Sequence, residues 1–298
     1  MKSKRYKPLA CIVAFLSFAP FFPHTHIFAA EDDFLYLQRL LKLAQINPNE
    51  AGPKDRIFFK DGFAYCTGPS ELAQENNKAA DKMKAGEFQQ AADMLENDLK
   101  NAALFFPFRY NLGTCYLHLN DLKRALLNYT KAQAVVPEYD VTYLQIGYVY
   151  ERKDRDRDAI DFYRTALKKN AKELNTYVLI GDLYLRRNQI QAAKIYYDAC
   201  LGINPRFPNG ILGRAKIHFR QGEYRKSLVL LKSVDTTGEY DKALHFYFAE
   251  CSYKLGDYQS ASRQYEMLLQ HKSDKFFITN SIALIEHKLS LSNRFIEQ

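Results

Sequence analysis

Apolar residues recur at helical spacing along most of this chain. In residues 141–152 they include Ile146 and Val149, and a second helical stretch follows at 157–169 after a short joint. Stretches of this kind predict helices with one buried face, whereas half-buried strands would show strict alternation. We therefore expect pairs of helices to form the body of the protein.

The pattern repeats every 34 residues. Small residues form one series at this spacing, Gly113, Gly147, Gly181, Ala215, Ala249 and Ala283. Alanines form a second series, Ala91, Ala125, Ala159 and Ala193, and tyrosines form a third, Tyr129, Tyr163 and Tyr197. Several series in one register, without an insertion, are typical of repeat proteins in which each unit packs on its neighbours.

Each unit is predicted to contain two helices separated by a turn residue. Only Gly, Asn and Asp occupy that turn: Gly86, Asn120, Asp154, Asn188, Gly222 and Gly256. These residues tolerate the left-handed backbone conformation that ends a helix. The small residues let helices approach closely and the tyrosines fill wider gaps, which accounts for a composition with 21 Tyr and 21 Phe. We expect Gly147 to lie where neighbouring helices touch.

These residues resemble the tetratricopeptide repeat family. Its pattern of Leu-Gly, Tyr, Ala, an aromatic residue, Ala and Pro is matched by Leu112, Gly113, Tyr116, Ala125, Tyr129, Ala132 and Pro137. The resemblance implies an all-α, right-handed superhelical solenoid of six helix-turn-helix units, at residues 72–105, 106–139, 140–173, 174–207, 208–241 and 242–275. Residues 276–298 would form a C-terminal capping helix, because terminal repeats need a polar cover.

Two units depart from the family pattern. The first has Lys78 and Lys82 at core positions, and the fifth has Arg214 and His218. We expect such departures to mark a cap or a local change in the curvature of the solenoid.

Residues 1–30 have the pattern of a secretory signal peptide. The first seven residues are basic, residues 8–19 form an uncharged apolar run, and Ala29-Ala30 precede an acidic stretch. An uncleaved membrane anchor is the alternative, but the apolar run is well short of the roughly 20 residues that a spanning helix needs. We expect export with cleavage, to the periplasm or outer envelope of a bacterium, with no stable membrane span afterwards.

Residues 31–71 are predicted to form an N-terminal cap. Within them, residues 32–45 predict an amphipathic helix, and the sequence IFFK-DG-FAYC at 57–66 carries the Asp-Gly signal of a hairpin turn. Residues 46–70 are nevertheless expected to be mostly loop, so an irregular loop packed on the first unit is the main interpretation of this stretch and a short hairpin is the alternative.

Candidate chemistry is sparse. The sequence contains no glycine-rich phosphate loop and no metalloprotease or serine hydrolase motif. No cysteine or histidine cluster has the spacing of metal ligands. We therefore expect no catalytic residue, cofactor or metal. Five residues of reactive type are expected in the core instead: His218, His245, Cys115, Cys200 and Cys251.

The first helices of the units are expected to line the inner groove of such a solenoid. Candidate partner-binding residues on them are Tyr110, His118, Tyr148, Arg152, Arg186, Phe219, Arg220, Tyr253 and Lys254. One column in this set, extended to Lys84, is basic in five of six units and could receive carboxylates of an acidic segment. We expect Arg186 and Arg220 to project into solvent. The alternative is that the column is an ordinary solvated position of the repeat.

The sequence thus favours a non-catalytic protein-interaction adaptor or scaffold of the cell envelope, which binds a partner peptide or helix in its groove. Nucleic-acid binding is weakly supported, because residues 1–30 supply four of the eight excess positive charges. The alternative class is a polysaccharide-binding or enzyme-accessory module with aromatic residues stacked on sugars. A third class is an enzyme with its site among the acidic residues of segment 31–71, namely Asp32, Asp33, Glu50, Asp55 and Asp61.

Overall fold

The computed structural model describes residues 56–234, 242–270 and 279–297. A hairpin of strands β1 (Arg56–Lys60) and β2 (Phe63–Thr67) comes first. The helices that follow are α3 (Glu71–Lys84), α4 (Phe88–Asp98), α5 (Phe106–His118), α6 (Leu122–Val135), α7 (Asp140–Arg152), α8 (Asp156–Lys169), α9 (Leu174–Arg186), α10 (Ile190–Ile203), α11 (Pro208–Arg220), α12 (Tyr224–Lys232), α13 (Lys242–Lys254), α14 (Tyr258–Gln270) and α15 (Thr279–Ile296). None of these helices is both long and apolar enough to cross a membrane. The predicted signal peptide and amphipathic helix lie outside the described residues.

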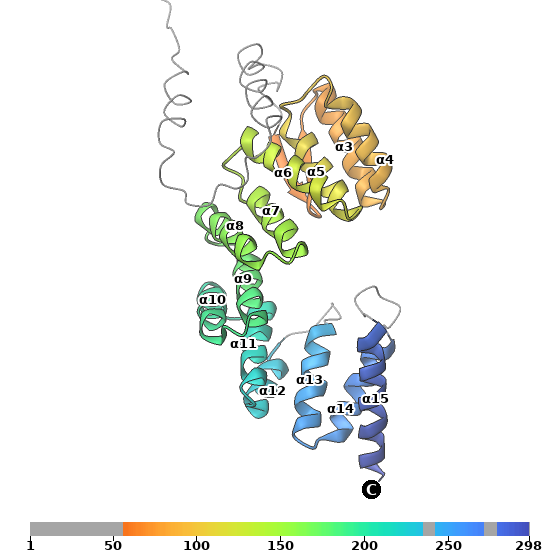
Figure 1. The fold of residues 1–298 in the computed structure, drawn as a ribbon, viewed down its shortest axis with the longest axis vertical. Coiled ribbons are helices and arrows are strands. Elements are labelled where there is room, and N and C mark those ends of the chain that lie inside the picture. Colours follow the sequence, from red (N-terminus) through yellow and green to blue (C-terminus); the bar gives the residue numbers. More distant parts are fainter. Residues whose placement is uncertain (1–55, 235–241, 271–278, 298) are drawn as a thin grey trace, which may run out of the picture.

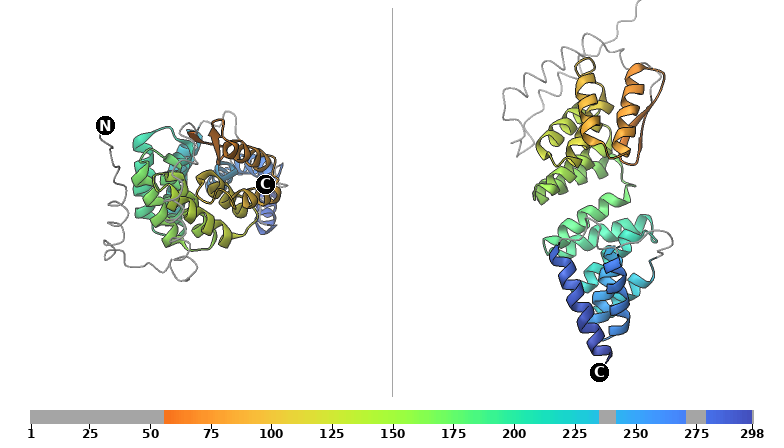
Figure 2. Two further views of the ribbon diagram at one scale, coloured as in Figure 1. Left: turned by 90° about the horizontal axis from the view of Figure 1, so that it is seen from above. Right: turned by 90° about the vertical axis from the view of Figure 1, so that its right-hand side faces the viewer.

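Successive helix pairs stack along one axis, so the molecule is elongated. The hairpin and α3 lie at one end and α15 at the other (Figure 1). Seen along that axis, the helix pairs follow one another around a curve (Figure 2). First helices of neighbouring pairs pack on each other, as α11 does on α9 and α13. This tandem arrangement confirms the predicted helical solenoid, and the hairpin adds the only strands in the described part of the chain.

The turn within each helix pair uses the left-handed backbone region, as predicted. Asn120, Asp154 and Asn188 have φ angles of 62°, 56° and 58°. The same region is used by the turn glycines, Gly86, Gly222 and Gly256. Because β-branched and bulky side chains are strained at positive φ, only Gly, Asn and Asp occur at this position of the repeat.

A glycine–tyrosine contact holds the two helices of a pair together. A Cβ atom added at Gly147 would lie 2.6 Å from ring carbons of Tyr163 and 3.2 Å from the backbone oxygen of Ala159. The predicted close approach at Gly147 is therefore confirmed. The same contact recurs in neighbouring pairs, between Gly113 and Tyr129 and between Gly181 and Tyr197.

The charged departures from the family pattern lie at the surface or in ion pairs. Lys78 occupies a core position of the family pattern but is exposed, and no helix pair precedes α3 in the described chain. Lys82 pairs with Glu87 at 2.8 Å. In the fifth unit, Arg214 of α11 forms an ion pair with Asp198 of α10. This departure thus makes a contact between two successive helix pairs.

The buried apolar residues form one large cluster and three smaller ones among the described residues. The large cluster extends from the hairpin through the helices up to Leu183 in α9. The smaller clusters lie across α9–α11, α11–α13 and α13–α15. The N-terminal half of the stack therefore shares one core, whereas the C-terminal half divides its core between successive pairs.

Residues 56–67 form the short hairpin that the sequence offered as the alternative to a loop. Asp61 and Gly62 form its two-residue turn with φ angles of 53° and 83°, and Lys60 pairs with Phe63 across it. Two positive φ angles in a two-residue loop match the twist of the flanking strands, which is why Asp-Gly favours this turn. The irregular loop that the sequence favoured for this stretch is therefore wrong.

Candidate protein-binding surface

The candidate residues share one kind of location. We use the term first-helix surface for the exposed faces of α3, α5, α7, α9, α11 and α13, the first helices of the pairs. Each of the nine residues selected from the sequence lies on one of these helices. Their environments differ: some are buried, some form ion pairs or hydrogen bonds within the chain, and some are exposed and could contact a partner.

The basic column lies at one end of these helices. Each member is the last residue of its helix: Lys84, His118, Arg152, Arg186, Arg220 and Lys254. The C-terminal end of a helix carries a partial negative charge from its unpaired carbonyl groups, and a cation there is stabilising. Helix electrostatics alone therefore favours basic residues at this position of the repeat.

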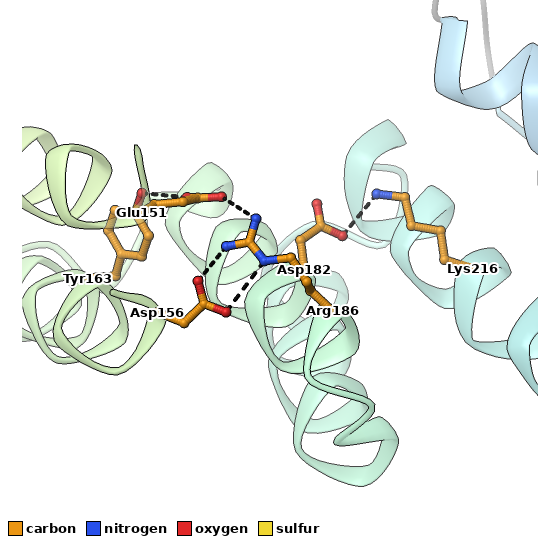
Figure 3. A network of polar contacts seen from close by, with 6 residues as sticks. All are labelled: Glu151, Asp156, Tyr163, Asp182, Arg186 and Lys216. Carbon is orange, nitrogen blue, oxygen red and sulfur yellow. Dashed lines mark hydrogen bonds and ion pairs between the residues drawn. The ribbon is translucent and has the colours of Figure 1, made fainter. Parts of the chain in front are cut away.

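Arg186 of the basic column forms ion pairs with two carboxylates of the preceding helix pair. One guanidinium nitrogen of Arg186 lies 2.6 Å from Asp156, at the start of α8, and another lies 3.3 Å from Glu151 in α7 (Figure 3). The Arg186 side chain remains half-exposed, but its charge is neutralised by two carboxylates of the preceding pair. Arg186 is thus exposed, as expected, but its guanidinium group is paired, because two acidic residues of the preceding helix pair lie within its reach.

Other members of the column also reach backward along the chain. Arg152 donates a hydrogen bond of 2.7 Å to the side-chain oxygen of Asn120, in the turn of the preceding unit. Lys84 lies 3.5 Å from Asp61 in the hairpin turn. Arg220 and Lys254 are exposed and make no hydrogen bond or ion pair with the residues that the structure describes. These two cations are therefore the members of the column most available to a partner.

Three clusters of a tyrosine, a carboxylate and a cation cross from one helix pair to the next. In one of them, the Tyr197 hydroxyl donates to Asp182 at 2.6 Å, and Lys216 of the next pair lies 2.9 Å from the same carboxylate oxygen. Figure 3 shows Asp182 and Lys216 of this cluster beside Tyr163, Glu151 and Arg186 of the neighbouring one. The other two clusters are Tyr163–Glu151–Arg186 and Tyr265–Glu250–Lys288.

The clusters change the electrostatic character of the first-helix surface. The pKa values of Tyr163, Tyr197 and Tyr265 are raised well above the ordinary range of a phenol. Burial is the largest cause and the adjacent carboxylate is the second, so each hydroxyl stays a hydrogen-bond donor. Each carboxylate faces a cation of the following helix pair or of α15. The surface is therefore a set of paired charges with a few unpaired cations, not a continuous cationic stripe.

Tyr110 is not part of the exposed surface. It is buried, at 1% exposure, and its hydroxyl donates to the backbone oxygen of Gly62 at 3.3 Å. Phe59 of the hairpin packs edge-on against its ring at 5.1 Å between centroids. The prediction that Tyr110 binds a partner is therefore wrong, because the hairpin covers its ring.

The remaining aromatic candidates are at least partly exposed. Tyr148 is exposed in α7. Phe219 is half-buried between Tyr224 and Tyr247, with edge-to-face contacts at 5.5 and 5.3 Å between ring centroids. Tyr253 is also half-buried, in an edge-to-face contact with Tyr258 at 5.6 Å. These fixed rings offer contact area that needs little further ordering on binding.

His118 is stacked on another ring. It lies parallel to Phe88 at 4.0 Å between centroids, with an interplanar angle of 6°. This partial burial, and then the charge of nearby Arg152, lower the pKa of His118 below its ordinary value. It is therefore a mostly neutral aromatic residue near neutral pH, which interrupts the basic column at α5.

A pocket of about 310 Å³ lies between three first helices. It is lined by Asn175, Val178, Leu179 and Asp182 of α9, Asn209, Leu212 and Lys216 of α11, and Ala243 of α13. The ion pair of Asp182 with Lys216 forms part of its wall. The two asparagines, 34 residues apart, were not selected from the sequence, although their equal position in successive units was a visible signal.

The residues of reactive type have structural roles. The thiols of Cys115, Cys200 and Cys251 are buried and form no disulfide, as predicted. Burial raises the pKa of the Cys115 thiol to about 12 and that of the Cys200 thiol to about 11, which disfavours the nucleophilic thiolate. His218 and His245 are partly buried and lie 2.6 Å from Glu223 and Gln264.

Comparison with known proteins supports the repeat assignment. Family models described as tetratricopeptide repeat match residues 76–140, 141–172 and 174–207. The chain is 27% identical over 114 residues to the protein CTR9 homolog of Arabidopsis thaliana, which covers 38% of this chain and 10% of that protein. It is 19% identical over 225 residues to tetratricopeptide repeat protein 8 of Caenorhabditis elegans, and this match covers 75% of this chain and 44% of that protein. The chain thus spans less than half the length of these curated relatives.

Solved structures share the fold. A tetratricopeptide repeat protein from Parabacteroides merdae superposes with a TM-score of 0.61 at 20% identity, over 75% of this chain and 87% of the other. PilW, a type IV pilus biogenesis factor, superposes with a TM-score of 0.60 at 15% identity, over 73% of this chain and 100% of the other. At these identities the likeness concerns the fold alone.

Proposed function

We propose that this chain, which carries tetratricopeptide repeats over residues 76–172 and 174–207, is a non-catalytic scaffold that binds a segment of a partner protein on the first-helix surface of α7–α13. Proteins built from these repeats generally act as protein-interaction scaffolds. The proposal extends that general role to one part of this chain.

One observation on α11 and α13 is the basis for placing the binding surface there. Arg220 and Lys254 are exposed cations without a partner among the described residues, and each directly follows a half-buried aromatic residue, Phe219 or Tyr253. The same helices, α11 and α13, contribute to the pocket beside α9. Exposed cations, ordered aromatic rings and an apolar-lined pocket on adjacent helices are the features of a protein-binding surface.

The charges suggest what the partner segment presents. Opposite Arg220 and Lys254, carboxylates would be favoured, because these cations are not neutralised within the described chain. At the pocket, neutral or apolar groups would be favoured, because Asp182 and Lys216 already neutralise each other at 2.9 Å. The partner would therefore be a mixed segment with acidic groups at one end, and not a uniformly acidic one.

The geometry of the aromatic rings favours a protein over a polysaccharide. Sugar rings need exposed aromatic faces, but Phe219 packs edge-to-face with both Tyr224 and Tyr247. The pocket is lined by Val178, Leu179 and Leu212, which suit apolar side chains of a peptide.

The variant Arg220→Glu with Lys254→Glu tests the proposed surface. The partner is first captured by the wild-type protein from an envelope extract and identified by mass spectrometry, and its affinity for each variant is then measured. The double variant should bind at least about tenfold more weakly, because reversing two exposed charges replaces attraction by repulsion. Wild-type binding should also weaken at high ionic strength, since exposed charges are screened.

A charge-matched control separates a local effect from a change in net charge. Arg225 and Lys168 are exposed on the second helices α12 and α8, so Arg225→Glu with Lys168→Glu changes the net charge equally but leaves the first-helix surface intact. This control should bind like the wild type. Equal loss in both variants, or no loss in the first, would remove the first-helix surface as the binding site.

We further propose that the protein is exported to a bacterial cell envelope. The basis is the basic and then apolar pattern of residues 1–30, which lie outside the described residues. N-terminal sequencing of the native protein should then begin near Ala30 or Glu31. An intact Met1 in a membrane fraction would contradict cleavage and support the uncleaved membrane anchor.

A further inference from the structure

The outer edge of strand β2 is paired with side chains instead of with a third strand. Asn111 of α5 accepts a hydrogen bond from the Ala64 amide at 2.8 Å and donates to the Ala64 carbonyl at 2.8 Å. Asn76 of α3 donates to the same carbonyl at 2.8 Å and accepts from Asn111 at 2.9 Å. Both peptide groups of this buried residue are thus satisfied by two carboxamides.

The next outward-facing residue of β2 is held in the same way. Asn77 accepts from the Cys66 amide at 2.9 Å and donates to the Cys66 carbonyl at 2.8 Å. Carboxamides on two first helices therefore take the place of a neighbouring strand, with an acceptor for the amide and at least one donor for the carbonyl of Ala64 and of Cys66. A strand edge needs such partners, since buried backbone groups are costly when unpaired.

Side chains of the hairpin fill the surrounding space. Ala64 is completely buried against the helices, and Phe63 is 8% exposed. On the other strand, Phe59 lies edge-on to Phe106, Tyr110 and Tyr139, with ring centroids 5.1 to 6.3 Å apart. The hairpin is therefore held by hydrogen bonds to its backbone and by aromatic contacts around Phe59. Together these contacts resemble the recognition of an extended peptide.

We propose that the first-helix surface of α3 and α5 is a strand-binding site whose ligand is the chain's own hairpin, residues 56–67. The ligand class is an extended segment with a small residue at the position of Ala64 and an aromatic residue at the position of Phe59. While the hairpin is seated, this part of the first-helix surface is closed to other proteins. The parts of α3 and α5 under the hairpin are then closed to a partner, whereas the first-helix surface from α7 onward stays open.

The covalent connection favours the resident hairpin over a competitor. Residues 68–70 join β2 directly to α3, and a short tether gives an effective concentration on the order of millimolar. A separate strand of the same chemistry should therefore enter only when that connection is cut. An isolated two-stranded hairpin is marginal in water, so it would become ordered on binding.

The test uses the full chain with a specific protease site inserted between Gly68 and Pro69, in the exposed connection. After cutting, a fluorescent peptide of residues 56–67 is added in excess under reducing conditions and its binding is followed by anisotropy. Because the peptide is in excess, the cut chain should release its own N-terminal segment, seen on gel filtration, and take up the peptide in its place. The uncut chain should bind at least about tenfold less peptide, because its site is already filled.

A peptide with Ala64→Arg is the matched control, since it keeps the other residues but cannot place a charged side chain in a fully buried position. It should bind at least about tenfold more weakly than the unchanged peptide. In the protein, Asn77→Ala should reduce uptake at least about fivefold, whereas Asn175→Ala, in the pocket beside α11, should not. Loss of the cut segment without peptide uptake, or equal uptake of both peptides, would overturn the proposal.

The proposal of a strand-binding site and the proposal of a partner site on α11 and α13 can be tested independently. The hairpin experiment depends on α3, α5 and residues 56–67, and it involves no partner protein. Loss of partner capture through Arg220 and Lys254 leaves the peptide result unchanged, and the reverse also holds.

Discussion

Replacing Gly147 by leucine should destabilise the protein by about 3 kcal/mol or more. Even the Cβ atom alone would lie 2.6 Å from two ring carbons of Tyr163. That ring cannot easily move, because it is fully buried and its hydroxyl donates to Glu151 at 3.0 Å. Leucine would force α7 and α8 apart. Urea unfolding followed by far-UV circular dichroism measures the change.

Gly202→Ala is the matched control for this substitution. Gly202 lies within α10 near its C-terminal end, and a Cβ atom there would meet nothing within 4 Å. Because alanine favours the helical conformation more than glycine does, this variant should be unchanged or up to about 1 kcal/mol more stable. Equal unfolding midpoints for the two variants would contradict the packing described for the glycine–tyrosine contacts.

Removing the amine of Lys288 should cost about 3 kcal/mol, measured in the same way. Its Nζ atom lies 2.5 Å from both carboxylate oxygens of Glu250, whose side chain is only 7% exposed. Lys288→Ala would leave this carboxylate buried with the Tyr265 hydroxyl as its remaining partner. A buried charge without a counterion is strongly destabilising, so α15 should detach from α13 and α14.

Two comparisons isolate the buried charge as the cause. Lys226→Ala removes an exposed pair with Glu223, and such pairs contribute about 0–1 kcal/mol. Glu250→Gln combined with Lys288→Met removes both charges at once and should recover most of the lost stability. If this double variant is no more stable than Lys288→Ala alone, loss of packing and not the unpaired carboxylate explains the effect.

The features that depend on one repeat were predictable from the sequence. The glycine and its tyrosine are always 16 residues apart, as at Gly147 and Tyr163, so their contact follows from two helices of fixed length and a fixed turn. The left-handed turns were predictable for the same reason, because Asn120 and its equivalents act through their own backbone.

Features that depend on contacts between distant residues were not predictable. The 34-residue register places Arg186 at a helix end, but it does not show that Asp156, 30 residues earlier, lies within reach. The Asp-Gly pair predicts the hairpin turn, yet the docking of the hairpin depends on Asn111, which follows Ala64 by 47 residues. Tyr110 was misjudged for this reason, since nothing in its own repeat shows that a strand covers it.

The uneven division of the core has a consequence for the order of folding during synthesis. The large cluster ends at Leu183, so all its residues have been made before the last third of the chain. Domains generally fold from the N-terminal end as the chain is produced, and repeats extend from a folded neighbour. The completed N-terminal repeats can then serve as the template on which each later helix pair, with its own small core, is added.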